Sequence, residues 1–304
     1  RMERRVVRVG TRKSPLALWQ TRWVIERLAA RWPDLEFEEV PMVTQGDLIL
    51  DRPLDQAGGR GLFVAEMEAA LLQGAIDLAV HSMKDLPIDL APGLTLGPVP
   101  PRADARDLLV SRHGWHDLRD LPQGARVGTS SPRRKAQLLA HRPDLEIVPV
   151  RGNLETRLRK LDEGAVDGLV LAAAGLQRMG YAVQGLPLEP PLFLPAVGQG
   201  ALGIELRAGD GWLLERLQPI GDPAATAAVR AERAFLKSLG GGCHLPIAAW
   251  AQVRGGRLTL FGRVLSPDGR RRLDGEISGA WEEAAALGRA LGERLLAQGA
   301  GELV

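Results

Sequence analysis

The sequence of 304 residues has little of several features that would mark a particular class of protein. A single cysteine excludes an internal disulfide framework and fits a reducing compartment. No cysteines and histidines are spaced as metal ligands, and no apolar run is long enough to cross a membrane. The first ten residues interleave arginine with valine and contain no apolar signal-peptide core. We therefore expect a cytoplasmic protein that binds no metal and no membrane.

The composition is otherwise ordinary for a globular protein, with one bias. Hydrophobic residues make up 45% and charged residues 25%, and the length allows two or three domains. The formal net charge of +2 is too small to indicate nucleic-acid binding. Only five of the 39 basic residues are lysines. Because a guanidinium binds a carboxylate or phosphate through two parallel hydrogen bonds, the arginine bias favours an anionic ligand.

Expected strands alternate with helices through the first two thirds of the chain. Periodicity and turn signals predict strands at residues 6–10, 36–43, 76–80, 94–99, 107–111, 126–128, 146–150 and 168–172. Residues 203–207 are apolar enough to return to the first sheet. Helices at 222–239 and 281–298 are expected on either side of two or three strands within 247–277. This pattern is typical of two α/β lobes followed by a small α+β domain.

Basic turns that contain a serine and a proline follow two of the expected strands. They are Thr11-Arg12-Lys13-Ser14-Pro15 and Thr129-Ser130-Ser131-Pro132-Arg133-Arg134. In each, the last serine suits the N-cap and the proline suits the first helical position. Helix N-termini offer unpaired N–H groups, and α/β proteins bind ligands beyond the carboxyl ends of strands. Two lobes would each present an anion-binding helix start toward a shared cleft, so the ligand should carry several negative groups.

Other arginines follow strands, and one acid stands among them. Arg151 and Arg178 come after strands, while Arg157 lies on the next helix and could equally be an outward surface charge. Asp85 could be a turn former before a proline. Among cations it would stay ionised, which suits the stabilisation of a developing cation or the movement of protons. His81 is expected to be a structural histidine with a satisfied hydrogen bond.

The lone cysteine, Cys243, follows a run of three glycines and precedes His244. Glycine frees the backbone from steric limits, so we expect the thiol on an exposed loop. Inside a strand or helix, a free cysteine would be read as a small buried hydrophobe. Here a covalent attachment point and a nucleophile both remain open, and the loop alone does not choose between them.

Six motifs of the sequence occur in the order found in one known family. They are GTRKSPLA at 10–17, AVHSMKDLP at 79–87, GTSSPRR at 128–134, RGN at 151–153, LPAVGQG at 194–200 and GGC at 241–243. Through these motifs the sequence resembles the porphobilinogen deaminases, also called hydroxymethylbilane synthases. The resemblance extends from about residue 5 to residue 300 and is specific, because several long motifs keep a fixed order.

The resemblance implies two lobes of the type II periplasmic-binding-protein kind, at 1–100 with 200–219 and at 101–199, and a small α+β domain at 220–304. It implies a transferase of tetrapyrrole (porphyrin and haem) biosynthesis that condenses four porphobilinogen molecules head to tail. Ammonia is released, and water frees the linear hydroxymethylbilane. A dipyrromethane cofactor would be joined to Cys243 by a thioether. A cytoplasmic monomer that passes its product to uroporphyrinogen-III synthase is also implied.

The resemblance also assigns roles to single residues. Asp85 matches the catalytic aspartate, and residues 46–61 resemble a flexible lid. The residues that match cofactor-binding positions, besides Cys243, are Ser14, Ser82, Lys84, Thr129, Ser130, Ser131, Arg133 and Arg134. The residues that match substrate-binding positions are Arg12, Arg151, Arg157, Arg178, Gln199 and Phe63. Because each pyrrole bears an acetate and a propionate, these arginines would hold the acid groups of the growing chain.

Two other functions remain open from the residues alone. A non-catalytic binding protein would close two lobes on an organic polyanion. A nucleic-acid-binding protein would need a basic face, against which the net charge of +2 speaks. A covalent adduct of two pyrrole units on Cys243 would distinguish the enzyme from both.

Overall fold

The computed structural model describes residues 5–43, 64–240 and 245–303. The chain divides into two compact units, Arg1–Ala103 with Ala201–Thr226 and Asp104–Gly200 with Ala227–Val304. Phe63, Cys243 and the predicted lid lie outside the described residues. The division into three domains stays a prediction.

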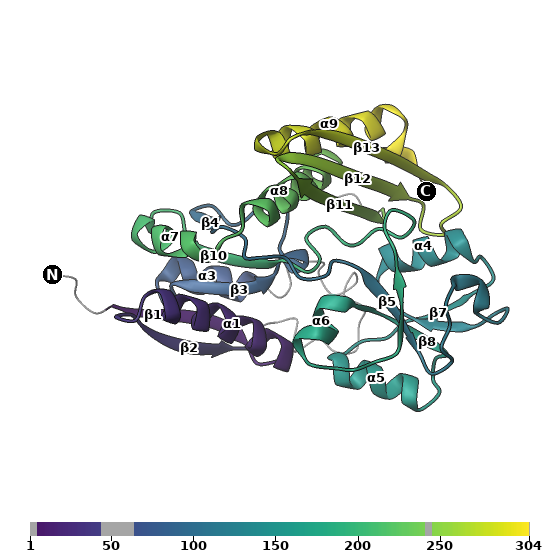
Figure 1. Cartoon of the computed structure of the whole chain (residues 1–304), viewed down its shortest axis with the longest axis horizontal. Coiled ribbons are helices and arrows are strands. Elements are labelled where there is room, and N and C mark those ends of the chain that lie inside the picture. Colours follow the sequence, from purple (N-terminus) through teal and green to yellow (C-terminus); the bar gives the residue numbers. More distant parts are fainter. Residues whose placement is uncertain (1–4, 44–63, 241–244, 304) are drawn as a thin grey trace. The chain divides into compact units, whose positions relative to one another are not determined.

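The first unit is built on a five-stranded sheet with the order β2-β1-β3-β10-β4 (Figure 1). Its strands are β1 (Val6–Arg12), β2 (Glu36–Met42), β3 (Leu78–Ser82), β4 (Leu94–Leu96) and β10 (Leu202–Arg207). β1 runs parallel to β2 and β3, whereas β10 runs antiparallel to β3 and β4. The predicted return of residues 203–207 to this sheet is therefore confirmed.

Helices cover this sheet because both of its faces are apolar. The helices of the unit are α1 (Pro15–Arg31), α3 (Ala65–Gln73) and α7 (Gly211–Leu217). Leu78 and Val80 of β3 belong to one buried cluster, which includes Val24 of α1. Ala79, between them, belongs to another, which includes Met67 of α3. Since successive side chains of a strand point to opposite faces, β3 is buried on both sides, as its unbroken apolar run indicates. Helix α7 was not predicted.

The second unit contains a five-stranded sheet with the order β7-β6-β8-β5-β9. Its strands are β5 (Asp107–Ser111), β6 (Arg126–Gly128), β7 (Glu146–Val148), β8 (Gly168–Ala172) and β9 (Gly185–Leu188), and its helices are α4 (Pro132–His141), α5 (Leu154–Asp162) and α6 (Ala173–Arg178). β6 is parallel to β7 and β8, and β5 is antiparallel to β8 and β9. The edge strand β9 was not predicted, because Pro187 suggested a connection; an edge strand tolerates a proline.

The C-terminal part of the second unit is an antiparallel sheet with two helices (Figure 1). Its elements are α8 (Pro223–Ser238), β11 (Ile247–Arg254), β12 (Arg257–Leu265), β13 (Arg272–Ala280) and α9 (Ala284–Ala297). α9 packs on β12 and β13. A Cβ atom on Gly288 of α9 would collide with the carbonyl oxygen of Ala231 on α8, so glycine is needed for the close approach of these helices.

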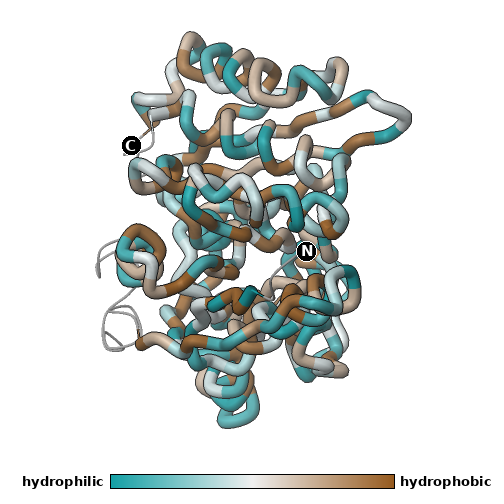
Figure 2. The backbone as a smooth tube through the Cα atoms, turned by 90° about the vertical axis from the view of Figure 1, so that its left-hand side faces the viewer, coloured by the Kyte–Doolittle hydropathy of each residue, from teal (hydrophilic) through white to brown (hydrophobic). Residues whose placement is uncertain are grey.

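The two five-stranded sheets share one strand order, and the C-terminal sheet is separate from both. The predicted fold class, two α/β lobes with a small α+β domain, is confirmed. Of the helices that the structure describes, none is both long and apolar enough to pass through a bilayer. Figure 2 agrees, because polar and apolar residues are interleaved along these helices.

Candidate active site

The carboxyl end of β1 leads directly into α1, and polar side chains fix this junction. The Ser14 hydroxyl caps α1 by accepting the backbone N–H of Ala17 at 3.4 Å. The buried hydroxyl of Thr21 donates to that of Thr11 at 2.9 Å, which ties the helix to the strand. Arg12 is thereby held at the end of β1, half-buried. The capping role of Ser14 is confirmed, and its cofactor role stays a prediction.

The segment that carries Asp85 leaves β3 in a fixed path. A short 3-10 helix, η2 (Met83–Asp85), follows Ser82. The N–H of Met83 donates to the carbonyl of Ala201 at 2.9 Å. A Cβ on Gly203 of β10 would lie 2.5 Å from Cδ1 of Leu86, so the buried Leu86 occupies the space that a side chain there would need. Both contacts hold Asp85, which is half-buried, at the carboxyl end of β3.

A buried histidine precedes this segment. Nε2 of His81 lies 3.0 Å from Oε1 of Glu205. Burial lowers the pKa of His81 to about 4, the negative charges of Asp85 and Glu68 oppose this shift, and the positive charge of Arg12 adds to it. The predicted satisfied histidine is therefore confirmed. These electrostatic interactions also show that Arg12, His81 and Asp85 lie in one region of the first unit.

In the second unit, the hydroxyl-rich turn after β6 is held by its own hydrogen bonds. The Thr129 hydroxyl accepts the N–H of Ser131 at 3.1 Å. The Ser131 hydroxyl caps α4 by accepting the N–H of Arg134 at 3.2 Å. The Ser130 hydroxyl donates to the carbonyl of Val150 at 2.7 Å, which joins the ends of β6 and β7. These hydroxyls shape the turn whatever they bind, and their contact with a cofactor stays a prediction.

The two consecutive arginines of α4 point into the second unit. Nη1 of Arg133 donates to Asp107 at 2.7 Å and to the carbonyl of Leu194 at 2.8 Å. Nε of Arg134 donates to Asp107 at 3.0 Å, and the amide of Gln199 also donates to Asp107, at 3.0 Å. Sequence reasoning did not find Asp107. Asp107 begins a strand 26 residues before Arg133, and nothing in the local sequence indicates that the two residues meet.

This cluster has one more positive charge than negative charge. Asp107 is 1% exposed, Arg133 6% and Arg134 7%. Burial would raise the pKa of Asp107, but the two guanidinium groups hold it well below its usual range. Burial lowers the pKa of Arg134. No second carboxylate of the described residues pairs with these arginines. A buried surplus cation favours a ligand that brings a carboxylate.

A third arginine of this unit, Arg151, supports the same conclusion. Gly152 has φ +110°, where a side chain would meet Thr156, and it directs the turn into α5, which Asn153 caps. Nη1 of Arg151, just before this turn, is buried and has no hydrogen-bond partner among the described residues. Because an unmet buried donor is costly, Arg151 is suited to bind an anion.

Arg178 and Arg157 are half-buried residues of α6 and α5. Nη2 of Arg178 donates to the carbonyl of Gly200 at 2.8 Å, and burial lowers its pKa to about 10. Lys84, in η2, is also half-buried. Phe63 and Cys243 are outside the described residues, although α8 is described to Ser238, five residues before Cys243.

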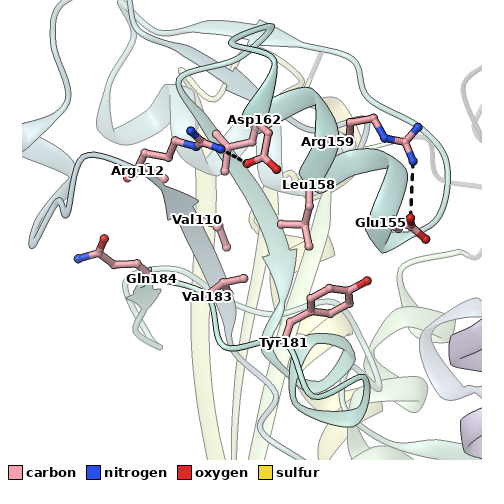
Figure 3. A pocket seen from close by; sticks show the side chains of 11 residues that line it. Val110, Arg112, Glu155, Leu158, Arg159, Asp162, Tyr181, Val183 and Gln184 are labelled. Carbon is pink, nitrogen blue, oxygen red and sulfur yellow. Dashed lines mark hydrogen bonds and ion pairs between the residues drawn. The ribbon is translucent and has the colours of Figure 1, made fainter.

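The second unit also contains a cavity of about 760 Å³ (Figure 3). Val110, Leu158 and Val183 give it apolar walls, and ion pairs of Arg112 with Asp162 and of Arg159 with Glu155 lie at its edge. None of the predicted site residues lines it. Within the described ranges, no cluster of three or more histidine, cysteine or acidic side chains could hold a metal ion.

Comparison with known proteins gives matches along almost the whole chain. Residues 7–215 match the family model of the porphobilinogen deaminase dipyrromethane cofactor binding domain, and residues 226–297 match that of the porphobilinogen deaminase C-terminal domain. The porphobilinogen deaminase of Moorella thermoacetica is 52% identical over 98% of this chain and 95% of its own length. That of Syntrophotalea carbinolica is 51% identical over 100% and 96%.

Solved structures with a similar fold are more distant. An extracellular-binding protein of a probable amino-acid ABC transporter from Bacillus subtilis is 14% identical, with a TM-score of 0.46 over 72% of this chain and 90% of its own. The sulphonate-binding protein SsuA of Escherichia coli is 17% identical, with a TM-score of 0.42 over 77% and 70%. The two domain models and the full-length relatives, by contrast, agree on one family. The chain belongs to the porphobilinogen deaminase family.

Proposed function

We propose that this chain is a hydroxymethylbilane synthase, a transferase of tetrapyrrole biosynthesis. It joins four porphobilinogen molecules head to tail, releases ammonia, and frees the linear hydroxymethylbilane with water. The observation that carries this proposal is the match of both domain models of one enzyme family, which together reach from residue 7 to residue 297. The described geometry supports it through the surplus cations of the second unit and the fixed acid of the first.

The residues present fit a dipyrromethane cofactor. When bound, this group supplies the pyrrole α-carbon to which the first substrate is joined. Its rings bear carboxylates, and the buried surplus charge of Arg133 and Arg134 and the unmet donor of Arg151 offer positive partners for such groups. Cys243 anchors the cofactor by a thioether. Lys84 and the hydroxyls of Ser14, Ser82, Thr129, Ser130 and Ser131 complete its polar surroundings.

Asp85 is the catalytic residue of this proposal. Its carboxylate accepts pyrrole N–H groups and stabilises the cation that forms when ammonia leaves porphobilinogen. Two features of the first unit support this role. The backbone hydrogen bond from Met83 to Ala201 fixes the segment that carries Asp85. Because His81 is neutral, it does not form an ion pair with the carboxylate of Asp85. A carboxylate held in place before the cation develops needs no reorganisation during the reaction.

Substrate carboxylates are bound by arginines in this proposal. The set is Arg12, Arg151, Arg157 and Arg178, with Gln199 and Phe63 as further contacts. The amide of Gln199 donates to Asp107 and to the carbonyl of Ala105, at 3.0 and 2.8 Å. Gln199 therefore also helps to hold the carboxylate of Asp107 against Arg133 and Arg134.

We also propose that the enzyme works as a cytoplasmic monomer and that uroporphyrinogen-III synthase consumes its product. The single cysteine supports the cytoplasmic location, because its thiol must stay free of disulfides until the thioether forms, as it would in a reducing compartment. Light scattering of the purified holoenzyme checks the monomer, and a mass of two chains would contradict it.

Intact-mass measurement tests the function directly. Active enzyme should carry a mass increase of two pyrrole units, and Ehrlich's reagent should stain the protein. Cys243→Ser is the matched control and should lose both signals together with turnover. An unmodified mass for active enzyme would refute the covalent cofactor. An unmodified mass together with no turnover would refute the proposed function and would favour a polyanion-binding protein instead.

A further inference from the structure

Three elements of the first unit bring ionisable side chains together beneath the Asp85 segment. His81 lies on β3, Glu205 on β10 and Glu68 on α3. Nε2 of His81 is 3.0 Å from Oε1 of Glu205, and the carboxyl group of Glu205 lies close enough to that of Glu68 to raise its pKa. Glu68 also accepts the backbone N–H of Ala91 at 2.9 Å. Glu205 is fully buried, His81 is 9% exposed and Glu68 is half-buried, so the contact of His81 with Glu205 is shielded from water.

The sheet register explains why this contact forms. Gly203 of β10 lies opposite His81 of β3, and Glu205 lies two residues further along β10. Residues two apart on a strand face the same side, so the carboxylate of Glu205 reaches diagonally across to the imidazole. The arrangement therefore depends on this register.

The protonation states follow from burial. Burial and the contact with Glu205 raise the pKa of Glu68 to about 7. The two carboxyl groups thus share a proton near neutral pH, because two neighbouring carboxylates repel each other, most strongly where one is fully buried. The pKa of His81 is lowered to about 4, so its ring is neutral. A neutral imidazole has one N–H, and the carboxylate oxygen at 3.0 Å is an acceptor for it.

We propose that Glu205 is a positioning residue for the reaction: it accepts the Nε2–H of His81 and holds the neutral ring so that His81 does not bind Asp85. Glu68 supplies the shared proton that makes this pair of carboxyl groups tolerable. The inference rests on the proposed role of Asp85. The other charges near His81 are those of Asp85, Glu68 and Arg12, and of these only the carboxylates could take its N–H.

The physical reason is a competition for one proton donor. If Glu205 is removed, Nε2–H loses its buried acceptor, and leaving a buried donor unpaired is costly. Asp85 is a carboxylate close enough to act electrostatically on His81. A ring that turns to Asp85 would occupy an oxygen that the reaction needs, and would lower kcat without removing a contact to substrate carboxylates.

A spectroscopic measurement tests this contact without reference to turnover. In protein labelled with 15N-histidine, His81 should show a neutral ring with its proton on Nε2 between about pH 5 and 8. Glu205→Gln should keep this tautomer, because an amide oxygen also accepts. Glu205→Leu should lose it. A charged ring near neutral pH, or a proton on Nδ1, would overturn the proposal even if the enzyme proves to be a deaminase.

Steady-state kinetics give the second measurement, on enzyme whose cofactor adduct has been verified by intact mass. Glu205→Leu should lower kcat about tenfold with KM unchanged, and Glu205→Gln should stay within about twofold of wild type. In a His81→Leu background, adding Glu205→Leu should have no further effect, because Glu205 acts through His81. Asp77→Asn, at a carboxylate of the same sheet that is 4% exposed and paired with arginines, is the control and should lose stability but keep kcat.

The outcomes are separable from those of the parent function. A wild-type kcat for Glu205→Leu, or additive losses in the double variant, would refute the positioning role while leaving the enzyme intact. If Glu205→Leu does not fold, the wild-type spectrum and the Glu205→Gln rate still decide the question. Absence of the adduct and of turnover in wild type would instead count against the proposed function.

Discussion

The two five-stranded sheets share a strand order, but the polar groups buried against them have opposite character. In the first, Glu205 on β10 meets a second carboxyl group and a neutral imidazole. In the second, Asp107 on β5 meets two guanidinium groups. β10 and β5 occupy equivalent places, since each is the antiparallel strand between two others of its sheet. The strand position supplies a buried carboxyl in both; its partners come from the adjacent strand β3 and helix α3 in the first unit and mainly from helix α4 in the second.

This difference matches the two demands of the proposed chemistry. The second unit has cations in excess, which suits the carboxylates of a pyrrole chain. The first keeps its histidine neutral and leaves Asp85 as a negative charge, which suits a developing cation. One framework can therefore serve opposite electrostatic tasks, because the same strand order carries different side chains in the two units. Four substitutions test this comparison.

Asp85→Asn should have the largest effect. The amide has almost the same shape but no charge, so kcat should fall by about a hundredfold or more. The two-pyrrole adduct should remain, because the anchoring and carboxylate-binding residues are unchanged. Rates measured with porphobilinogen, together with intact mass, check this. Asp89→Asn, at an exposed acid nearby, is the control. A wild-type rate for Asp85→Asn would remove this residue from the mechanism.

Asp107→Asn should chiefly cost stability. It would leave two buried guanidinium groups without their counter-charge, and breaking a buried pair costs about 3–5 kcal/mol. The pKa of Asp107 is depressed in the folded chain, so its contribution exists above the unfolded pKa of about 4 and is lost as the pH falls below it. Urea unfolding near neutral pH measures the loss. Asp162→Asn, in an exposed pair, should change little. Equal effects of both substitutions would contradict the importance of burial.

Arg151→Met should separate binding from stability. Nη1 of Arg151 makes no hydrogen bond to the described residues, so the free energy of unfolding should be unchanged or slightly higher in the variant. Loss of a charge-assisted hydrogen bond to a ligand carboxylate should raise KM about tenfold. Arg159→Met, at an exposed arginine of α5, is the matched control and should alter neither quantity. A marked drop in stability would show that Arg151 has a structural role instead.

Glu68→Gln should have the smallest effect, visible only in pH dependence. The pKa of Glu68 is raised from 4.5 to about 7, so its contribution to stability declines as the pH rises through this range. The pKa of His81 is lowered from 6.5 to about 4, which has the opposite slope. In wild type these slopes offset each other between about pH 4.5 and 6.5. In the variant, the free energy of unfolding should therefore rise more steeply with pH over this range than in wild type. The same pH dependence in both proteins would contradict the shared proton.

Local signals in the sequence predicted much of the fold. The serine and proline pairs at 14–15 and 131–132 start α1 and α4, because capping needs only residues adjacent in the chain. The return of β10 followed from its apolar run. Strand β9 was missed because its proline suggested a connection, and α7 because its seven residues carry a weak pattern.

The buried clusters could not be predicted, since their members are far apart in sequence. His81 and Glu205 are separated by 124 residues, and Asp107 and Arg133 by 26. Arg133 and Arg134 were expected at a ligand-facing strand end, which is where α4 begins. Their inward direction depends on the register of β5 against β8, which periodicity does not specify.

At position 203, a hydrogen atom stands where other residues have a side chain. Leu86, which follows Asp85 in the chain, fills that space. Even a methyl group there would lie 2.5 Å from Cδ1 of Leu86 and would force that side chain to move. The segment that carries Asp85 is therefore sensitive to added hydrocarbon alone, with every charge and every hydrogen-bonding group still present.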